Sequence, residues 1–149
     1  MMQKDRILKS LRVNYAVSFI AALLVVVAFE CGYLYKGALL TVLSNTAVYI
    51  MQVVTVMLTV ILIPLAIKGF SNNLKKAKGV SEREFLKIYS KNTLRRVFLL
   101  FIAIIVSEFA YYGLNYEGAL YCAILAYGSL IYSYPTKLVL EDYLQGLNN

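Results

Sequence analysis

The sequence lacks histidine and tryptophan, and only two cysteines and two prolines occur among its 149 residues. Without histidine, one chain cannot form the Ser-His or Cys-His pair that most often activates a nucleophile. A Cys-x-x-Cys motif, a phosphate-binding loop and a repeated acidic cluster suited to a metal are absent from the sequence as well. We therefore expect a protein that is not an enzyme and that holds no metal or other cofactor.

Charge is also scarce. Charged residues make up 15% of the chain, hydrophobic residues make up 60%, and the mean hydropathy is +0.68. That is too little polar material to coat a soluble core. The apolar residues lie in blocks rather than in amphipathic alternation, which is typical of a chain whose solvent is lipid. We expect a single all-α membrane domain.

Four apolar blocks predict a bundle of four transmembrane helices, at about 13–33, 46–67, 97–114 and 118–134. About 20 residues, at ~1.5 Å each, cross the hydrocarbon layer. The uncharged stretch 38–67 exceeds one span, so we expect a tilt or an outer extension, and we expect Pro64 to end or kink the helix. The end of the first block, Ala28-Phe29-Glu30-Cys31, lacks the small-x-small spacing of a cleavage site, which favours an uncleaved anchor over a signal peptide.

Lysine and arginine are unequally shared among the connections. Four precede the first block, nine lie in the basic loop 68–96, and only Lys36 lies between the first two blocks. Because basic flanks are retained in the cytoplasm, both termini, the loop 68–96 and the tail 135–149 are predicted to be cytoplasmic, in a bacterial inner membrane. This asymmetry and attraction to anionic headgroups explain the net charge of +7 without nucleic acid as a partner.

Within the basic loop, Ser81-Glu82-Arg83-Glu84 has the spacing of a capping box. Basic residues then recur every four positions on one face of the helix that would follow. We expect a short cytoplasmic surface helix that turns into the third span, and a similar one in the tail; a solvated basic linker is the alternative. In the helical interpretation, four basic residues bind anionic lipid: Lys87, Lys91, Arg95 and Arg96.

The two halves of the chain share a pattern. Glu30 and Gly37-Ala38-Leu39 have counterparts in Glu108 and Gly118-Ala119-Leu120, although seven residues separate the first pair and ten the second. The pattern favours two repeated helical hairpins related by an axis along the membrane normal.

Glu30 and Glu108 are carboxylates within apolar blocks, where a charge is costly. Glu30 lies about 18 residues past Arg12, close to the outer surface, so we interpret it as an interfacial residue. Glu108 is deeper, roughly 18 Å from the inner boundary. It serves either as a structural hydrogen-bonding group or as a proton-carrying site. Small polar residues on one face of the second span are its predicted partners: Gln52, Thr55 and Thr59.

The two cysteines, Cys31 and Cys122, fall near the outer ends of their blocks. A disulfide between the first and fourth spans and two inert buried thiols are both open interpretations.

The later half of the chain resembles small four-helix inner-membrane proteins of bacteria, an uncharacterised group. The likeness rests on Leu86-Lys87-Ile88-Tyr89, Arg95, Tyr111-Tyr112 and Tyr134-Pro135-Thr136. It implies an architecture and brings no activity with it. Two functions stay open: a non-catalytic module that binds lipid, a partner membrane protein or a second copy of itself, and a small proton- or cation-linked transporter or channel subunit that uses Glu108.

Overall fold

The structure is a computed structural model that describes residues 2–77 and 79–146, of which 86% are helical. Within these residues no strand occurs. The elements are α1 (Met2–Glu30), α2 (Ala38–Val42), α3 (Asn45–Lys76), α4 (Glu82–Leu114), α5 (Glu117–Tyr132) and α6 (Lys137–Gln145). The predicted all-α class is confirmed.

Three helices are long and apolar enough to cross a membrane: α1, α3 and α4. With 29, 32 and 33 residues they measure about 44 to 50 Å, more than the ~30 Å of a hydrocarbon core. The fourth predicted span corresponds to α5, whose 16 residues measure only about 24 Å. These lengths and compositions are those of a multi-pass membrane protein.

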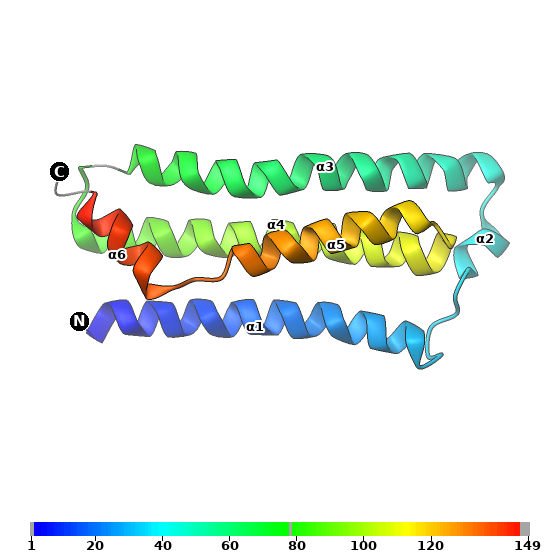
Figure 1. Cartoon of the computed structure of the whole chain (residues 1–149), viewed down its shortest axis with the longest axis horizontal. Coiled ribbons are helices and arrows are strands. Elements are labelled where there is room, and N and C mark those ends of the chain that lie inside the picture. The colour runs from blue at the N-terminus through cyan, green and yellow to red at the C-terminus, as the bar shows by residue number, and fades with distance from the viewer. Residues whose placement is uncertain (1, 78, 147–149) are drawn as a thin grey trace.

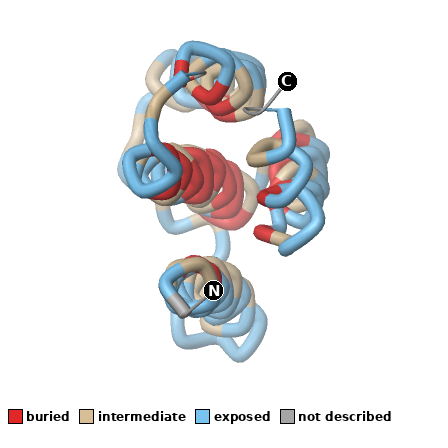
Figure 2. Tube along the Cα trace, turned by 90° about the vertical axis from the view of Figure 1, so that its left-hand side faces the viewer, coloured by how far each residue is buried: buried red, intermediate tan, exposed pale blue. Residues whose placement is uncertain are grey.

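The bundle is organised around α4. Helices α1 and α3 lie on opposite sides of it, and α5 packs against it from a third direction (Figures 1 and 2). Helix α4 therefore contributes more buried residues than any other helix, as the red stretch in Figure 2 shows. At the end where α1 finishes, Gly37 adopts φ 76° and donates its N–H to Tyr112 O at 2.7 Å, which ties the linker to α4.

The prediction of a long basic loop at 68–96 is wrong, because most of these residues are helical. Helix α3 continues through Pro64 to Lys76, so proline does not end it, and α4 begins at Glu82 and runs without a break to Leu114. Transmembrane helices tolerate proline because neighbouring helices and local adjustments of the backbone satisfy the groups that proline leaves without a partner. The start of the uncharged stretch 38–67 forms a separate short helix, α2, before α3 begins.

The helix predicted at the start of α4 is present, but the prediction that it lies along the membrane surface is wrong. Residues 82–96 continue the bundle axis, because their apolar face packs into a protein core instead of lying on the membrane (Figure 1). Ser81 occupies the N-cap position, but its side chain makes no capping hydrogen bond, so the capping box does not form. The core at this end joins α1, α3, α4 and α6 through buried residues that include Leu8, Leu11, Phe70, Leu74, Phe85, Leu86, Tyr89 and Leu140.

The tail forms α6, a short amphipathic helix that closes this core. Thr136 caps it by accepting a hydrogen bond from the Val139 N–H, and Leu140 is buried beneath it. An ion pair between Lys137 and Asp5, 2.7 Å long, ties α6 to α1.

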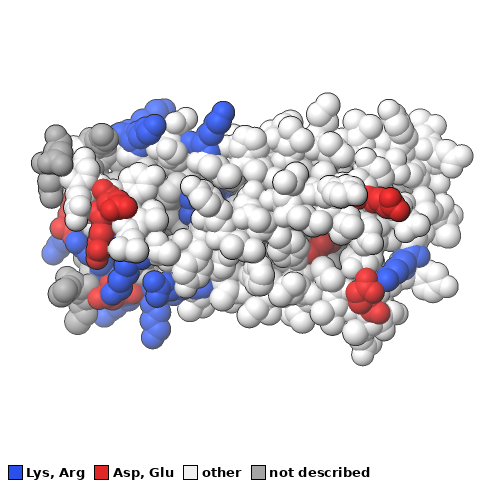
Figure 3. Space-filling view, in the orientation of Figure 1, with Lys and Arg blue, Asp and Glu red and all other residues white. Residues whose placement is uncertain are grey.

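Charge divides the molecule lengthwise. Lysine and arginine gather at the end that contains residue 2, the α3–α4 connection and α6, which we call the basic end, whereas Lys36 lies at the opposite end (Figure 3). A white belt of uncharged side chains separates the two ends.

Candidate functional site

Glu108 lies on α4 and is buried, with 3% of its surface exposed. The Tyr127 hydroxyl, from α5, donates a hydrogen bond to Glu108 Oε1 at 2.5 Å. Glu108 Oε2 is equally buried and finds no partner among the described residues. Such an unpaired oxygen can take up a proton or accept one further hydrogen bond.

The predicted polar partners of Glu108 lie elsewhere in the helix contact. Thr55 and Thr59 are buried on α3, but the Thr59 hydroxyl meets that of Ser107 at 3.2 Å. Gln52 is half-buried and makes no side-chain hydrogen bond within the described residues. The interhelical contact of Glu108 comes instead from Tyr127, a tyrosine inside an apolar helix, and such a hydroxyl usually has a partner when buried.

Glu30 occupies a different environment at the end opposite the basic end. Its carboxylate accepts hydrogen bonds from Tyr112 Oη at 2.9 Å and from Lys36 Nζ at 3.0 Å. About half of its side chain, 54%, is exposed. The ring of Phe29 stacks on Tyr112 with centroids 4.6 Å apart and holds that hydroxyl in place. Glu30 is thus a solvent-reachable carboxylate fixed by its neighbours.

An apolar layer separates Glu108 from the basic end. It is formed by buried residues of α1, α3, α4 and α5: Ala22, Ala66, Val97, Leu100, Ala103, Ile104, Ala126 and Leu130. These side chains carry no polar group that could relay a proton or coordinate an ion. A path for solutes along the interior of one copy would have to cross this layer.

A groove between α1 and α4 opens where the basic end meets the apolar belt. Its volume is about 570 Å³, and its lining combines polar, cationic and apolar side chains: Asn14, Ser18, Lys91, Asn92, Leu94, Arg95, Val97 and Phe98. Lys91 and Arg95, two of the residues predicted to bind anionic lipid, are exposed and one turn apart here. Lys87 is also exposed, but it is not part of this lining.

Arg96, the fourth predicted lipid-binding residue, is separated from the other three. Its side chain is turned into the protein, and only 9% of its surface is exposed. Nη2 donates to the Ser133 carbonyl at 2.8 Å, and the guanidinium lies 3.9 Å from the centre of the Phe70 ring. Arg96 therefore does not share a solvated surface with Lys87, Lys91 and Arg95.

Two carboxylates at the basic end are held ionised by lysines from distant segments. A hydrogen bond from Lys137 holds the pKa of Asp5 below its usual value, and a hydrogen bond from Lys4 does the same for the pKa of Glu82. The Lys4–Glu82 pair measures 2.6 Å. These pairs join the start of α1 to α6 and to α4.

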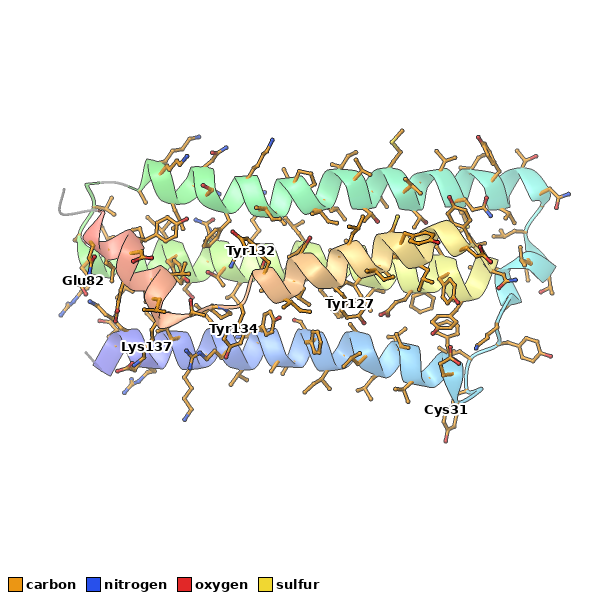
Figure 4. All side chains as sticks on the ribbon, in the orientation of Figure 1. Cys31, Glu82, Tyr127, Tyr132, Tyr134 and Lys137 are labelled. Carbon is orange, nitrogen blue, oxygen red and sulfur yellow. The ribbon has the colours of Figure 1, made fainter. Side chains whose placement is uncertain are left out.

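The two cysteines are free thiols in different surroundings. Cys31 is exposed just beyond α1 (Figure 4), whereas Cys122 is buried in α5. The structure thus contains no bridge between them.

Comparisons with protein-family models, with curated proteins and with solved structures found nothing that matches this chain.

Proposed function

We propose that the chain is a non-catalytic, four-span membrane protein that binds anionic phospholipid at its basic end. In this proposal α5 is the fourth span. Its outward face is apolar, with Leu120, Ile124, Leu125 and Ile131 exposed, as expected of a helix that faces lipid. Flanking tyrosines, Tyr121 and Tyr132, would lie at the two interfaces and offset its short length.

The proposed orientation places the basic end, and both termini, in the cytoplasm of a bacterial inner membrane. The support is the separation of charge, with Lys36 as the one cation at the opposite end of the described chain. The two repeated hairpins remain a prediction from sequence. Helix α2 precedes α3 in the first hairpin, whereas α5 follows α4 after only two residues in the second.

The observation that carries the proposal is the groove between α1 and α4. Two cations and three neutral polar side chains share its lining with the apolar side chains of Leu94, Val97 and Phe98. In the proposed orientation the cations would stand at the level of the headgroups. A diacyl phospholipid has this same division, with an anionic phosphate above apolar chains. Attraction of about 1 kcal/mol for each basic residue near an anionic membrane surface would favour such a lipid over a zwitterionic one.

The test compares two neutralised lysines on one helix. Lys91→Gln removes a groove cation, and Lys87→Gln removes an exposed cation one turn away that does not line the groove. Retention of phosphatidylglycerol against phosphatidylcholine would be measured by native mass spectrometry of the purified full chain. We expect selectivity to fall mainly in Lys91→Gln; equal losses in both variants, or no selectivity in the original chain, would refute groove binding.

A second candidate function is a proton- or cation-linked transporter or channel subunit that uses Glu108. It is favoured by one observation, the buried Glu108 oxygen that has no partner among the described residues. Purified size in detergent and proton and cation flux in liposomes test it, in the original chain and in Glu108→Gln. Flux lost on substitution would support an oligomeric pathway around Glu108, and absence of flux in both would reject it.

A further inference from the structure

Arg96 is a buried cation with no carboxylate beside it. The ion pairs of the described residues are Lys4–Glu82, Lys36–Glu30 and Lys137–Asp5, and Arg96 takes part in none of them. The Ser133 carbonyl and the Phe70 ring satisfy part of the guanidinium, but its Nε is buried without a partner. An uncompensated buried charge is costly, so the protein gains stability from any anion that reaches it.

Arg96 lines a partly open cavity between α3 and α4. The cavity measures about 160 Å³, and it is a different space from the lipid groove, which lies between α1 and α4. Its polar lining consists of Asn73 on α3 and Asn92, Arg95 and Arg96 on α4. Apolar residues complete the wall, and no carboxylate contributes to it.

The polar groups around the cavity are arranged as donors. Asn73 Nδ2 donates to Asn92 Oδ1 at 3.2 Å, and the amide hydrogens of Asn92 stay available as donors. An arginine side chain has donors and no acceptor, and two arginines, Arg95 and Arg96, line this cavity. On the same face of α4, the buried hydroxyls of Tyr89 and Thr93 also lack partners among the described residues, and each can donate one hydrogen bond. Because of its two arginines, the cavity lining has donors in excess of acceptors.

We propose that this cavity binds a phosphate group, as a phosphate ester or as inorganic phosphate. A tetrahedral anion offers several acceptor oxygens at once, and a guanidinium binds two of them through its planar fork. The site lies at the headgroup level of the proposed membrane orientation, so the phosphate of a lipid and that of a soluble compound are the two sources. The inference does not need the groove to bind lipid, although Arg95 and Asn92 border both spaces.

The experiment measures the thermal unfolding midpoint of the purified full chain in neutral detergent. One arm titrates sodium phosphate against sodium chloride of equal ionic strength, and the other adds phosphatidylglycerol or phosphatidylcholine to the micelles. Asn73→Leu removes a donor found only in this cavity, and Arg96→Lys keeps the charge but removes the fork and Nε. Asn14→Leu, which alters only the lipid groove, is the matched control.

If the site exists, phosphate raises the midpoint of the original chain and of Asn14→Leu, and the apparent affinity falls at least about tenfold in Asn73→Leu and Arg96→Lys. A response to added phospholipid alone, lost in the same two variants, supports the site with lipid as the source. Equal responses in all four proteins, or no response to either ligand, overturn the proposal. Because Asn73 is only half-buried, its variant is expected to fold even where Arg96→Lys does not.

Discussion

Removal of the Tyr127 hydroxyl should destabilise the bundle more than loss of an average interhelical hydrogen bond. Such bonds within membranes contribute about 0.6 kcal/mol on average and about 1.7 kcal/mol at most. Tyr127→Phe, however, leaves both oxygens of a carboxyl that is only 3% exposed without a partner among the described residues. A buried polar group in that condition costs about 1–3 kcal/mol, so we expect a loss of about 2 kcal/mol.

A double-mutant cycle isolates this effect from changes in packing. The free energy of unfolding would be measured for the original chain, Tyr127→Phe, Glu108→Leu and the double variant, by denaturant titration in mixed micelles followed by circular dichroism. With the carboxyl already absent, deleting the hydroxyl should change stability little, which gives a coupling of about 1.5 kcal/mol or more. Tyr132→Phe is the matched control on the same helix, because Tyr132 is 79% exposed and should tolerate the change.

Additive effects would refute the reasoning. A coupling below about 0.5 kcal/mol, the level at which independent sites add, would mean that Glu108 replaces Tyr127 with another donor. Loss of stability in Tyr132→Phe as large as in Tyr127→Phe would point to a general requirement for tyrosine in α5.

Three further results are expected. As pH falls below about 4, toward the lowered pKa of Asp5, protonation of Asp5 removes a stabilising contact that is fully present at higher pH. Thermal unfolding of Lys137→Gln should therefore show a flatter dependence on pH in this range, and an unchanged slope would contradict the role of the pair. Ala103→Leu, at a fully buried position of α4, should lower the free energy of unfolding by about 1–3 kcal/mol through overpacking. Ala16→Leu, on the exposed face of α1, should change it little, and equal denaturation midpoints in the two variants would contradict the packing described. Cys31 should react with a membrane-impermeant maleimide added outside intact cells, and the Cys31→Ser variant should not be labelled at this position. Labelling only after lysis would reverse the proposed orientation.

Composition predicted the helical class because long uncharged blocks have few other folds in lipid. It did not predict how far the helices extend beyond those blocks. Residues 68–76 and 82–96 carry many charges, so they appeared to be a loop and a surface helix. Their apolar positions join one core across distant segments, as where the rings of Phe70 and Tyr89 meet, and that tertiary core is what continues α3 and α4.

The candidate sites show the same limit. Sequence position identified Glu108 as the deeper carboxylate, because depth follows from counting residues along one helix. It did not identify Tyr127 as the partner, since this depends on how α5 is rotated against α4. Equally, spacing of four residues grouped Arg95 with Lys91 correctly, but one further residue turns Arg96 by about 100° into the protein.

The central position of α4 has a consequence for biogenesis. Helices α1 and α3 lie on opposite sides of α4 and both pack against it. The ribosome delivers them first, so they enter the bilayer before the surface that unites them has been synthesised. Assembly of the first half therefore waits for residues 82–114. A nascent chain that stops before Glu82 would leave two unassembled apolar helices, a form that membrane proteases are expected to remove.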